Sequence, residues 1–462
     1  MKRVQLAIVG GGPAGLAAAA EAVSLGLSVA LLDEQAAVGG QIYRHVEEVM
    51  EAAPRRASLL GKDYRRGAEL ARRFHGSGAL HLERTLVWHG EPGRLWYYRE
   101  GRAASLEADR ILVATGAMER PVPLPGWTLP GVMTVGAAQI LLKTSGILPR
   151  GRTVLVGQGP LLLLFAQQLL AAGGKLEAII ETLPADRYRR ALRHVPKAVG
   201  SGYLRQGLAL LLALRRQAVR FFRGAEDVRL EGDGEVGVVR FRSRSTEHSL
   251  EASHVFLHEG VVPNCQLTRL LGCEHLWDPQ QHCFRPRTDQ WGNTTVEGVM
   301  VAGDGAAING ALAAEEAGRL AAFETARALG RFDRAARNRL ARASLARLRK
   351  QRAGRLFLDT LYAPVNALPR HPDTVVCRCE EVTAGEIRAA VAIGGTGPNQ
   401  MKAYLRCGMG PCQGRMCGLT VSTIIADELG ISPRNVGYFR VRPPLKPLPL
   451  EVLAEAELPP DN

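Results

Sequence analysis

The chain has 462 residues, a length typical of about three domains, and 46% of them are hydrophobic, as is ordinary for a globular protein that needs no disulfide cross-links. Its net charge of +14 at pH 7 comes almost entirely from arginine, since only eight of the 59 basic residues are lysine. Compositional bias explains this charge most simply and docking to an acidic protein is the alternative, whereas no nucleic-acid-binding module is present.

The sequence indicates no targeting or membrane-spanning segment. The apolar residues that follow Lys2 and Arg3 run directly into a glycine-rich turn, without a signal-peptide cleavage pattern. The longest apolar stretch, residues 160–174, is shorter than the roughly 20 residues that a membrane span requires. We therefore expect a cytoplasmic protein whose contact with the inner face of the membrane is at most peripheral.

The first residues predict a βαβ unit that binds a dinucleotide. A strand at 4–9 enters the turn Gly10-Gly11-Gly12-Pro13-Ala14-Gly15, and a helix to about residue 25 and a strand at 27–32 follow. In this G-x-G-x-x-G turn, Gly10 permits the tight bend, Gly12 lets the backbone approach a pyrophosphate, and Gly15 lets helix and strand pack closely. Because the start of the helix carries free N–H groups, we expect this turn, with Pro13 and Ala14, to hold the phosphates.

An acidic residue at the end of the second strand supports this interpretation. Asp33 lies about 20 residues beyond the glycine turn, where a carboxylate is expected to hold the ribose hydroxyls, and Glu34 beside it can share or take that role. The following Gly39-Gly40-Gln41 resembles the loop after the ribose-binding acid in flavoproteins of the glutathione reductase type. Gly40 and Gln41 are therefore further candidates for the cofactor site.

Two later segments indicate FAD rather than NAD as the cofactor of this fold. Ala114-Thr115-Gly116 ends a buried strand at 111–116, as in glutathione-reductase-like flavoproteins. Residues 301–305, which include Gly303 and Asp304, resemble the second FAD motif of those proteins, in which the aspartate contacts the ribityl–pyrophosphate region. We therefore predict an FAD site built from the glycine turn, Asp33 and these two segments.

The strand, turn, helix and strand pattern begins again at residue 153 and predicts a second dinucleotide fold. It is inserted within the first, because a further strand of the first domain appears only at 298–304. Gly157 and Gly159 match the first two fingerprint positions, but the third is Leu162, and Glu181 stands one place after the expected acid. These departures count against NAD(P) and leave a different nucleotide, such as ATP or FMN, or a purely structural domain as alternatives.

Residues 331–355 contain ten arginines or lysines and one aspartate. Apolar residues recur there at helical spacing, so we predict an amphipathic helix whose basic side is a solvated face or, alternatively, a contact surface for another protein. The apolar positions of this predicted helix are Phe332, Ala336, Leu340, Leu345 and Leu348. A proline-containing linker follows, and the chain ends in a proline-rich tail that we expect to extend along a surface.

Five of the eight cysteines lie close together near the C-terminus, a crowding that indicates a metal rather than disulfides in a cytosolic protein. Cys377 and Cys379 precede a helix that a Thr383–Glu386 capping box begins. Cys412 and Cys417 lie in a glycine-rich turn that enters another helix. Thiolates at helix N-termini are stabilised by nearby N–H groups and the helix dipole.

These four thiolates can hold one 2Fe–2S cluster, which is the interpretation we prefer. Structural zinc is the alternative metal, although zinc sites more often use Cys-x-x-Cys in both halves, and a site without metal is the third interpretation. Cys407 is spare and can in principle replace Cys412, but the Gly-Met-Gly-Pro-Cys-Gln-Gly-Arg-Met-Cys turn makes Cys412 and Cys417 the better pair. No redox-active cysteine pair occurs in the nucleotide folds, which argues against thiol–disulfide chemistry.

Together these motifs resemble one family nearly over the whole chain. The resemblance is carried by GGGPAG, DEQ with GGQIY, ATGAMERPVPLPGWTLPGVMT, NCQLTRLLG, and CRCEE with RCGMGPCQGRMC. The family comprises the FAD-binding large subunits of opine oxidases, hydrogen cyanide synthase and D-hydroxyproline dehydrogenase. The first nucleotide region is also similar to the alpha subunit of heterotetrameric sarcosine oxidase, and the cysteine module to bacterioferritin-associated-ferredoxin-like domains, whose usual final pair is Cys-x-x-Cys.

The resemblance implies an α/β, glutathione-reductase-like flavoprotein with two dinucleotide folds and a small, mostly helical C-terminal iron–sulfur domain. The predicted boundaries are 1–120 and 285–330 for the FAD domain, 121–284 for the inserted domain, 331–373 for the basic helix and linker, 374–440 for the 2Fe–2S domain and 441–462 for the tail.

As to function, the resemblance implies the alpha subunit of an oxidoreductase complex acting on CH–NH or CH–NH2 groups. A second FAD-containing subunit would oxidise an amino or imino acid, a small ferredoxin-like subunit would join it, and this chain would relay electrons through its FAD and cluster. The alternatives are an NAD(P)H-dependent reductase of the ferredoxin-reductase type and a subunit of glycine-oxidising hydrogen cyanide synthase. A non-catalytic scaffold disagrees with the intact FAD motifs.

Overall fold

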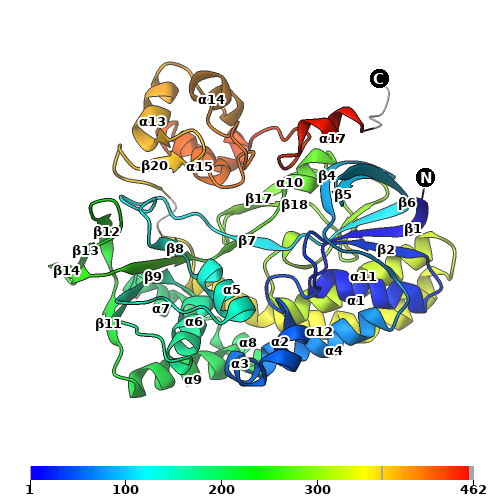
Figure 1. The fold of residues 1–462 in the computed structure, drawn as a ribbon, viewed down its shortest axis with the longest axis horizontal. Coiled ribbons are helices and arrows are strands. Elements are labelled where there is room, and N and C mark those ends of the chain that lie inside the picture. The colour runs from blue at the N-terminus through cyan, green and yellow to red at the C-terminus, as the bar shows by residue number, and fades with distance from the viewer. Residues whose placement is uncertain (1, 366–367, 457–462) are drawn as a thin grey trace.

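A computed structural model describes residues 2–365 and 368–456 of the chain. Residue 1, residues 366–367 of the predicted linker and the last residues of the predicted tail, 457–462, lie outside this description. Two nucleotide folds lie side by side, and a small helical module that contains the cysteines lies above them in Figure 1. None of the helices in the described ranges is long and apolar enough to cross a membrane.

The first fold is built on a sheet with the order β3-β2-β1-β6-β5-β4, in which β19 also pairs with β6. Strands β3, β2, β1, β6 and β19 run parallel, whereas β4 and β5 form an antiparallel extension. Its strands are β1 (Lys2–Val9), β2 (Val29–Leu32), β3 (Leu80–Leu82), β4 (Leu86–Glu91), β5 (Arg94–Arg99), β6 (Arg102–Val113) and β19 (Val299–Val301).

Helices cover one face of this sheet and bury the alanine-rich side of the first helix. They are α1 (Pro13–Ser24), α2 (Val46–Ala52), α3 (Pro54–Leu60), α4 (Lys62–His75) and α11 (Ala311–Ala328). Small residues let α1 and α11 approach closely: a Cβ on Gly318 would lie 2.1 Å from the carbonyl oxygen of Ala14. A second apolar cluster fills the opposite face and includes Leu267 and the tail residue Leu445.

The second fold has a parallel sheet with the order β11-β10-β9-β15-β8. Its strands are β8 (Val132–Thr134), β9 (Thr153–Gln158), β10 (Ala178–Glu181), β11 (Arg220–Arg223) and β15 (His254–Glu259), and an antiparallel sheet consists of β12 (Glu226–Glu231), β13 (Val238–Ser243) and β14 (Thr246–Glu251). The helices are α5 (Val135–Ser145), α6 (Pro160–Ala171), α7 (Ala185–Leu192), α8 (Val195–Ala198) and α9 (Tyr203–Arg216).

Short elements connect the two folds. The antiparallel pair β7 (Ala117–Glu119) and β16 (Val261–Pro263) runs between them. After β16 come α10 (Gln266–Leu270) and the hairpin of β17 (His275–Asp278) and β18 (Cys283–Pro286). The next strand, β19, pairs with β6 of the first sheet. The second fold is therefore inserted within the first in space as well as in sequence.

The basic helix α12 (Arg334–Leu361) extends further than the sequence predicts and packs on α11, α7 and α8. Its buried positions include Ala341, Ser344 and Leu348, whereas the predicted core residue Leu340 is 48% exposed. Most of the basic side chains of α12 are exposed, but two of them also pair with acids of α11. The guanidinium of Arg337 pairs with the buried Glu324, and that of Arg347 pairs with the buried Glu316, both on α11.

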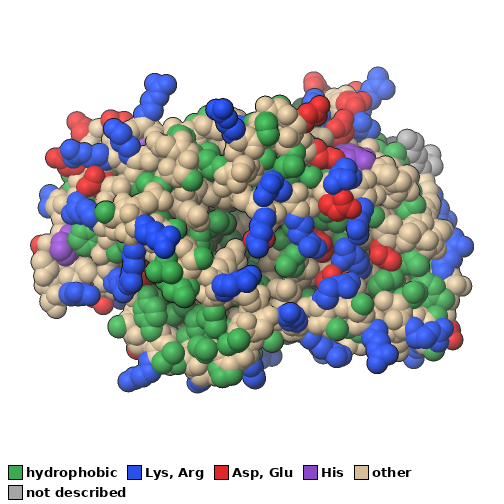
Figure 2. Space-filling view, turned by 90° about the horizontal axis from the view of Figure 1, so that it is seen from below, with side chains coloured by type: hydrophobic (Ala, Val, Ile, Leu, Met, Phe, Trp, Pro, Cys, Tyr) green, Lys and Arg blue, Asp and Glu red, His purple; other side chains and the backbone are tan. Residues whose placement is uncertain are grey.

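Basic side chains are dispersed on the face that Figure 2 shows, where lysine and arginine alternate with apolar and acidic groups. On this face the basic side chains form no single stripe of the kind that indicates a nucleic-acid-binding surface.

The C-terminal module comprises β20 (Val375–Cys377), β21 (Val382–Thr383), α13 (Ala384–Ala392), α14 (Pro398–Leu405), α15 (Gly418–Glu428) and α16 (Pro433–Val436), and α17 (Leu450–Ala454) lies in the tail. The predicted capping box is present at the start of α13. The module has its own apolar core, which includes Cys377, Cys407 and Cys417. The indole N–H of Trp127 donates to the carbonyl oxygen of Val375 at 2.7 Å and joins the module to the nucleotide folds.

Candidate functional site

The glycine turn between β1 and α1 has the tight geometry that the fingerprint predicts. Gly10 has a φ of +110°, and a Cβ there would lie 2.5 Å from the carbonyl oxygen of Ala114. A Cβ on Gly15 would lie 2.0 Å from the carbonyl oxygen of Gly10, so a side chain is excluded at both positions. Gly12 is the N-cap of α1 and supplies no side-chain cap, which leaves the first N–H groups of the helix for a ligand. The turn fits a pyrophosphate group.

Asp33 and Glu34 have different environments. Asp33 is 8% exposed, and its carboxylate accepts hydrogen bonds from the N–H of Gly11 and, at 2.7 Å, from that of Gln35. Burial raises the pKa of Asp33, and these two hydrogen bonds oppose the rise. Glu34 is more exposed and pairs with Lys446 of the tail. Asp33 is therefore the carboxylate held against the glycine turn, while Glu34 connects this edge of the site to the tail.

The loop after Asp33 packs against the glycine turn. The N–H of Gly39 donates to the carbonyl oxygen of Gly11 at 2.8 Å, and a Cβ on Gly40 would lie 2.8 Å from the Cα of Gly12. Lys143 of α5, which the sequence reasoning missed, donates to the carbonyl oxygen of Gln41 at 3.1 Å. Lys143 is 4% exposed, and burial lowers its pKa to about 7.

The two later predicted segments reach the same turn from the other side. The N–H of Ala114 donates to the carbonyl oxygen of Val9 at 2.8 Å, which places the Ala114-Thr115-Gly116 segment beside β1. A Cβ on Gly303 would lie 2.9 Å from the Cβ of Ala14. Asp304 accepts hydrogen bonds from the N–H groups of Asn309 and Gly310 at 2.8 and 2.9 Å and orders the approach to α11. Four distant segments of the chain thus surround the start of α1.

The second glycine turn is well formed, but its surroundings are filled by the chain itself. Gly157 and Gly159 have φ values of +127° and +115°, and Leu162 lies in the core beneath α6 at 2% exposed. The Gln158 side chain donates to the carboxylate of Glu259 at 2.8 Å and to the carbonyl oxygen of Ala363 at 3.0 Å.

Glu181, the acid that ends β10, also has a hydrogen-bond partner within the chain. Glu181 is 6% exposed and accepts a hydrogen bond from the Tyr188 hydroxyl at 3.2 Å. Two residues after Glu181, Leu183 packs against Leu361 at the end of α12 and against Tyr362. The position at which a nicotinamide cofactor would place its adenosine ribose is therefore lined by the chain's own tyrosine and leucine side chains.

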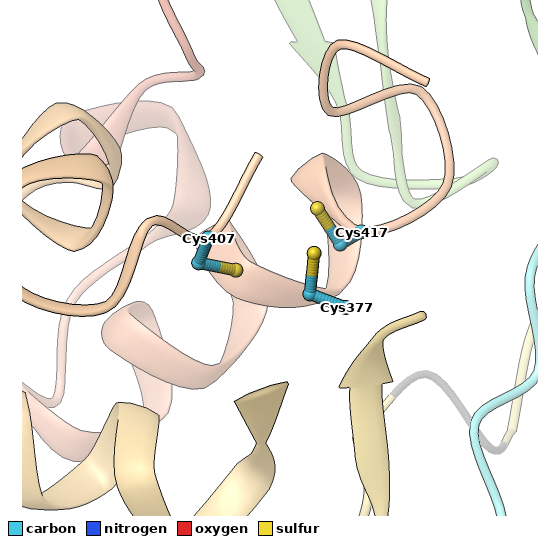
Figure 3. Close-up of side chains that lie close together, drawn as sticks. All are labelled: Cys377, Cys407 and Cys417. Atoms are coloured by element: carbon cyan, nitrogen blue, oxygen red, sulfur yellow. The ribbon is translucent and has the colours of Figure 1, made fainter. Parts of the chain in front are cut away.

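The cysteine module brings three sulfur atoms together. The Sγ atoms of Cys377, Cys407 and Cys417 all lie within 4.8 Å of one another, and all three residues are buried. Figure 3 shows these side chains converging from the end of β20, the loop after α14 and the start of α15. The N–H groups of Gly408 and Glu380 donate to Cys377, and contacts with Cys407 and Cys417 hold the pKa of the Cys377 thiol below its usual range.

Cys379 and Cys412 form a second contact beside this group. The two thiols interact directly, and the N–H of Cys412 donates to Cys379. Close packing of the glycine-rich loop makes this contact: a Cβ on Gly410 would lie 2.3 Å from the Cβ of Cys379. The structure does not bring all four predicted ligands into one group: Cys377 and Cys417 form an inner pair, whereas Cys379 and Cys412 contact each other outside it. Cys407, set aside from the sequence as spare, adds a fifth sulfur beside the inner pair.

A small cavity of about 30 Å3 lies where the nucleotide folds meet the cysteine module. Its walls include Met118, Asn264 and Arg269 from the nucleotide-fold side and Arg415, Leu419 and Tyr438 from the module. The N–H of Asn264 donates to the carbonyl oxygen of Gly116 at 2.9 Å, and the Thr115 hydroxyl donates to the carbonyl oxygen of Asn264 at 3.3 Å. The predicted flavin segment and the cysteine turn therefore approach the same junction.

Two family models match this chain. Residues 4–328 match the pyridine nucleotide-disulphide oxidoreductase family, and residues 372–456 match the sarcosine oxidase A3 domain. The first model covers both nucleotide folds, and the second covers the cysteine module together with most of the tail. The fold expected from the sequence, two nucleotide domains of the flavoprotein reductase type with a small helical module, is thus confirmed.

Known proteins resemble the chain over nearly its whole length. One of the opine oxidase A subunits, that of Rhizobium meliloti (strain 1021), is 46% identical over 97% of this chain and 98% of its own length. The HcnB protein of hydrogen cyanide synthase from Pseudomonas aeruginosa is 34% identical over 96% of both chains. Among solved structures, L-proline dehydrogenase from P. horikoshii matches with a TM-score of 0.72 and 20% identity, covering 98% of this chain and 80% of its own.

The identity to opine oxidase A subunits over full length and the match of both nucleotide folds lead to one assignment. The chain belongs to the pyridine nucleotide-disulphide oxidoreductase family and, within it, to the flavoprotein oxidoreductase subunits that include the opine oxidase A subunits.

Proposed function

We propose that this chain is the alpha subunit of a heteromeric, flavin-dependent dehydrogenase of amino or imino acids, of the opine or D-hydroxyproline type. A partner subunit with its own FAD oxidises the C–N bond, and this chain relays the electrons through an FAD and a 2Fe–2S cluster. The observation that carries the proposal is the common junction of two carrier sites, where the Thr115-Gly116 segment and the cysteine turn approach one cavity.

The residues of this chain serve the relay by holding the two carriers. FAD exchanges electron pairs with organic substrates and single electrons with iron–sulfur clusters, and this is the chemistry that the bound groups supply. The glycine turn would offer N–H groups to the phosphates, and Asp33, which lies against that turn, would hold the ribose hydroxyls. Cys377, Cys379, Cys412 and Cys417 would supply the four thiolates that hold the cluster.

Co-expression tests the relay directly. The chain is produced alone and together with the subunits encoded beside it, and dye-linked oxidation of opines, D-hydroxyproline, proline and glycine is measured. We expect activity with an opine or imino acid only in the co-expressed complex, and its loss when this chain lacks FAD. Full activity of the isolated chain with any of these substrates contradicts the proposal, and preference for glycine supports the alternative of a hydrogen cyanide synthase subunit.

NADH and NADPH are expected to leave the flavin of this protein oxidised. Glu181 is bonded to Tyr188, and Gln158 is bonded to Glu259 and the carbonyl of Ala363, so the groups that would recognise the nicotinamide cofactor are engaged. Anaerobic titration of the purified complex is followed at the flavin absorption bands. Stoichiometric bleaching within seconds would instead favour an NAD(P)H-dependent reductase of the ferredoxin-reductase type.

The contact between Lys446 and Glu34 is expected to support FAD binding. Lys446→Glu places two carboxylates side by side at the edge of the ribose site and loosens the tail, whose Leu445 N–H donates to the carbonyl oxygen of Trp88 at 2.8 Å. We expect the FAD dissociation constant to rise about fivefold, which corresponds to about 1 kcal/mol for an exposed charge pair. Flavin fluorescence on dilution measures it, with Lys350→Glu on the outer side of α12 as the control.

A further inference from the structure

Arg269 occupies an unusual position between the two carrier sites. It lies in α10 and lines the junction cavity together with Met118 on the flavin side and Arg415 on the side of the cysteine turn. The neighbouring Asn264 is bonded to the Thr115-Gly116 segment, so the helix that carries Arg269 begins directly beside the proposed flavin site.

Aromatic rings connect Arg269 to the cysteine module. Its guanidinium carbon lies 4.2 Å from the ring centroid of Tyr438 and 5.0 Å from that of Phe284. The Tyr438 hydroxyl donates to the carbonyl oxygen of Gly414 at 3.2 Å, midway along the turn from Cys412 to Cys417. One tyrosine ring therefore separates the positive charge of Arg269 from the backbone of the cysteine turn.

The guanidinium of Arg269 has no acidic partner. Its Nε and Nη2 atoms are buried without a hydrogen-bond acceptor, and no ion pair within residues 2–365 and 368–456 includes it. Burial lowers the pKa of Arg269, and the groups that oppose this shift are Cys265 and Tyr438 rather than a carboxylate.

Two other buried arginines have acceptors for their guanidinium groups. Arg120 donates to two carbonyl oxygens, at 2.9 and 2.6 Å, and Arg337, which stacks on Trp291, pairs with Glu324. Burying a cation that has no acidic partner costs free energy, unless another negative charge lies nearby. The anionic centre that four thiolates would hold supplies such a charge, across the Tyr438 ring from Arg269.

We propose that Arg269 is a positioning residue for electron transfer, whose fixed positive charge at the flavin–cysteine junction favours the reduced state of the cluster. A 2Fe–2S cluster held by the cysteines would gain one negative charge on accepting one electron. A cation held by aromatic rings beside that centre lowers the free energy of the more negative state, because enclosed charges are weakly screened. This inference rests on the proposed 2Fe–2S cluster.

A redox titration of the co-expressed complex tests the inference. Arg269→Met removes the charge but keeps an unbranched side chain, Arg269→Lys keeps a charge, and Arg216→Met on exposed α9 is the control. At a fixed applied potential we expect the ratio of reduced to oxidised cluster to fall about tenfold in Arg269→Met, equivalent to about 59 mV for one electron. Arg269→Lys should retain most of the wild-type ratio, and Arg216→Met all of it.

Iron and FAD contents are measured on every variant, and Arg269→Gln replaces Arg269→Met if the latter does not fold. Equal cluster potentials in wild type and in an iron-loaded, charge-removing variant would overturn the role of Arg269 and leave the relay itself untouched. A wild-type complex without iron would overturn the proposed relay and this inference together. A fall of the same size in Arg216→Met would show that net charge, rather than the position of Arg269, is responsible.

Discussion

Gly15→Ala is expected to produce a chain that no longer retains FAD. The added methyl group would lie 2.0 Å from the carbonyl oxygen of Gly10 in the turn and 3.3 Å from a side-chain carbon of Ile8 in β1. The start of α1 must then move away from β1, and its N–H groups leave the position that the phosphates require. We expect FAD content to fall at least tenfold and the free energy of unfolding to fall by about 3 kcal/mol.

Gly207→Ala provides the matched control for this methyl group. Gly207 lies inside α9, and no atom lies within 4 Å of the Cβ that alanine would add. Alanine favours helix over glycine by about 1 kcal/mol, so this variant should be as stable as wild type or slightly more stable. Both variants are compared by thermal unfolding and by flavin absorbance after gel filtration. Wild-type FAD content in Gly15→Ala would exclude the first glycine turn as the FAD site.

Cys417→Ser is expected to abolish the metal centre. Cys417 is fully buried and is the N-cap of α15, and its Sγ atom lies within 4.8 Å of those of Cys377 and Cys407. A serine hydroxyl is a poor ligand for iron in a thiolate site, so the cluster would lose one of its four protein sulfurs. We expect iron and labile sulfide to fall at least tenfold, with loss of visible absorption beyond the flavin bands, while FAD stays bound.

Two further cysteine variants show whether this effect is specific. Cys273→Ser is the control, because Cys273 is buried elsewhere and its Sγ lies 3.5 Å from the Thr294 hydroxyl, where serine can bond. Cys407→Ser should retain iron if the two contacting pairs are the ligands, whereas Cys412→Ser should lose it. The reverse result would exchange the roles of Cys407 and Cys412. Zinc at one per chain without iron in the wild type would contradict the cluster.

Local sequence patterns were sufficient to predict the turns. The spacing of Gly10, Gly12 and Gly15 after an apolar strand specifies a tight strand–helix connection, in which Gly12 lets the backbone approach a pyrophosphate. The structure has the same close contacts at Gly10 and Gly15. The Thr383–Glu386 capping box was predictable for the same reason, since its partners are three residues apart and form within one helical turn.

Contacts between distant residues were not predictable in this way. The pairing of Lys446 with Glu34 spans 412 positions, and nothing in the proline-rich tail indicates which edge of which sheet it meets. The apolar spacing of the basic helix predicts that Leu340 is buried, but Leu340 is exposed. The α11 side chains that pair with Arg337 and Arg347 decide which face of α12 is covered. The position of Lys143 beside Gln41 likewise depends on how α5 of the inserted fold packs against the first nucleotide fold.

The sequence by itself determined the family, the two nucleotide folds and the crowding of cysteines, because each is encoded by residue types at short and fixed spacings. Tertiary structure alone decided that Cys407 joins the inner pair of sulfurs, that the chain itself lines the second nucleotide site, and that Arg269 lies at the junction without an acid. These features arise from packing between separate domains, where burial, close approach and unpaired charge are properties of the assembled molecule.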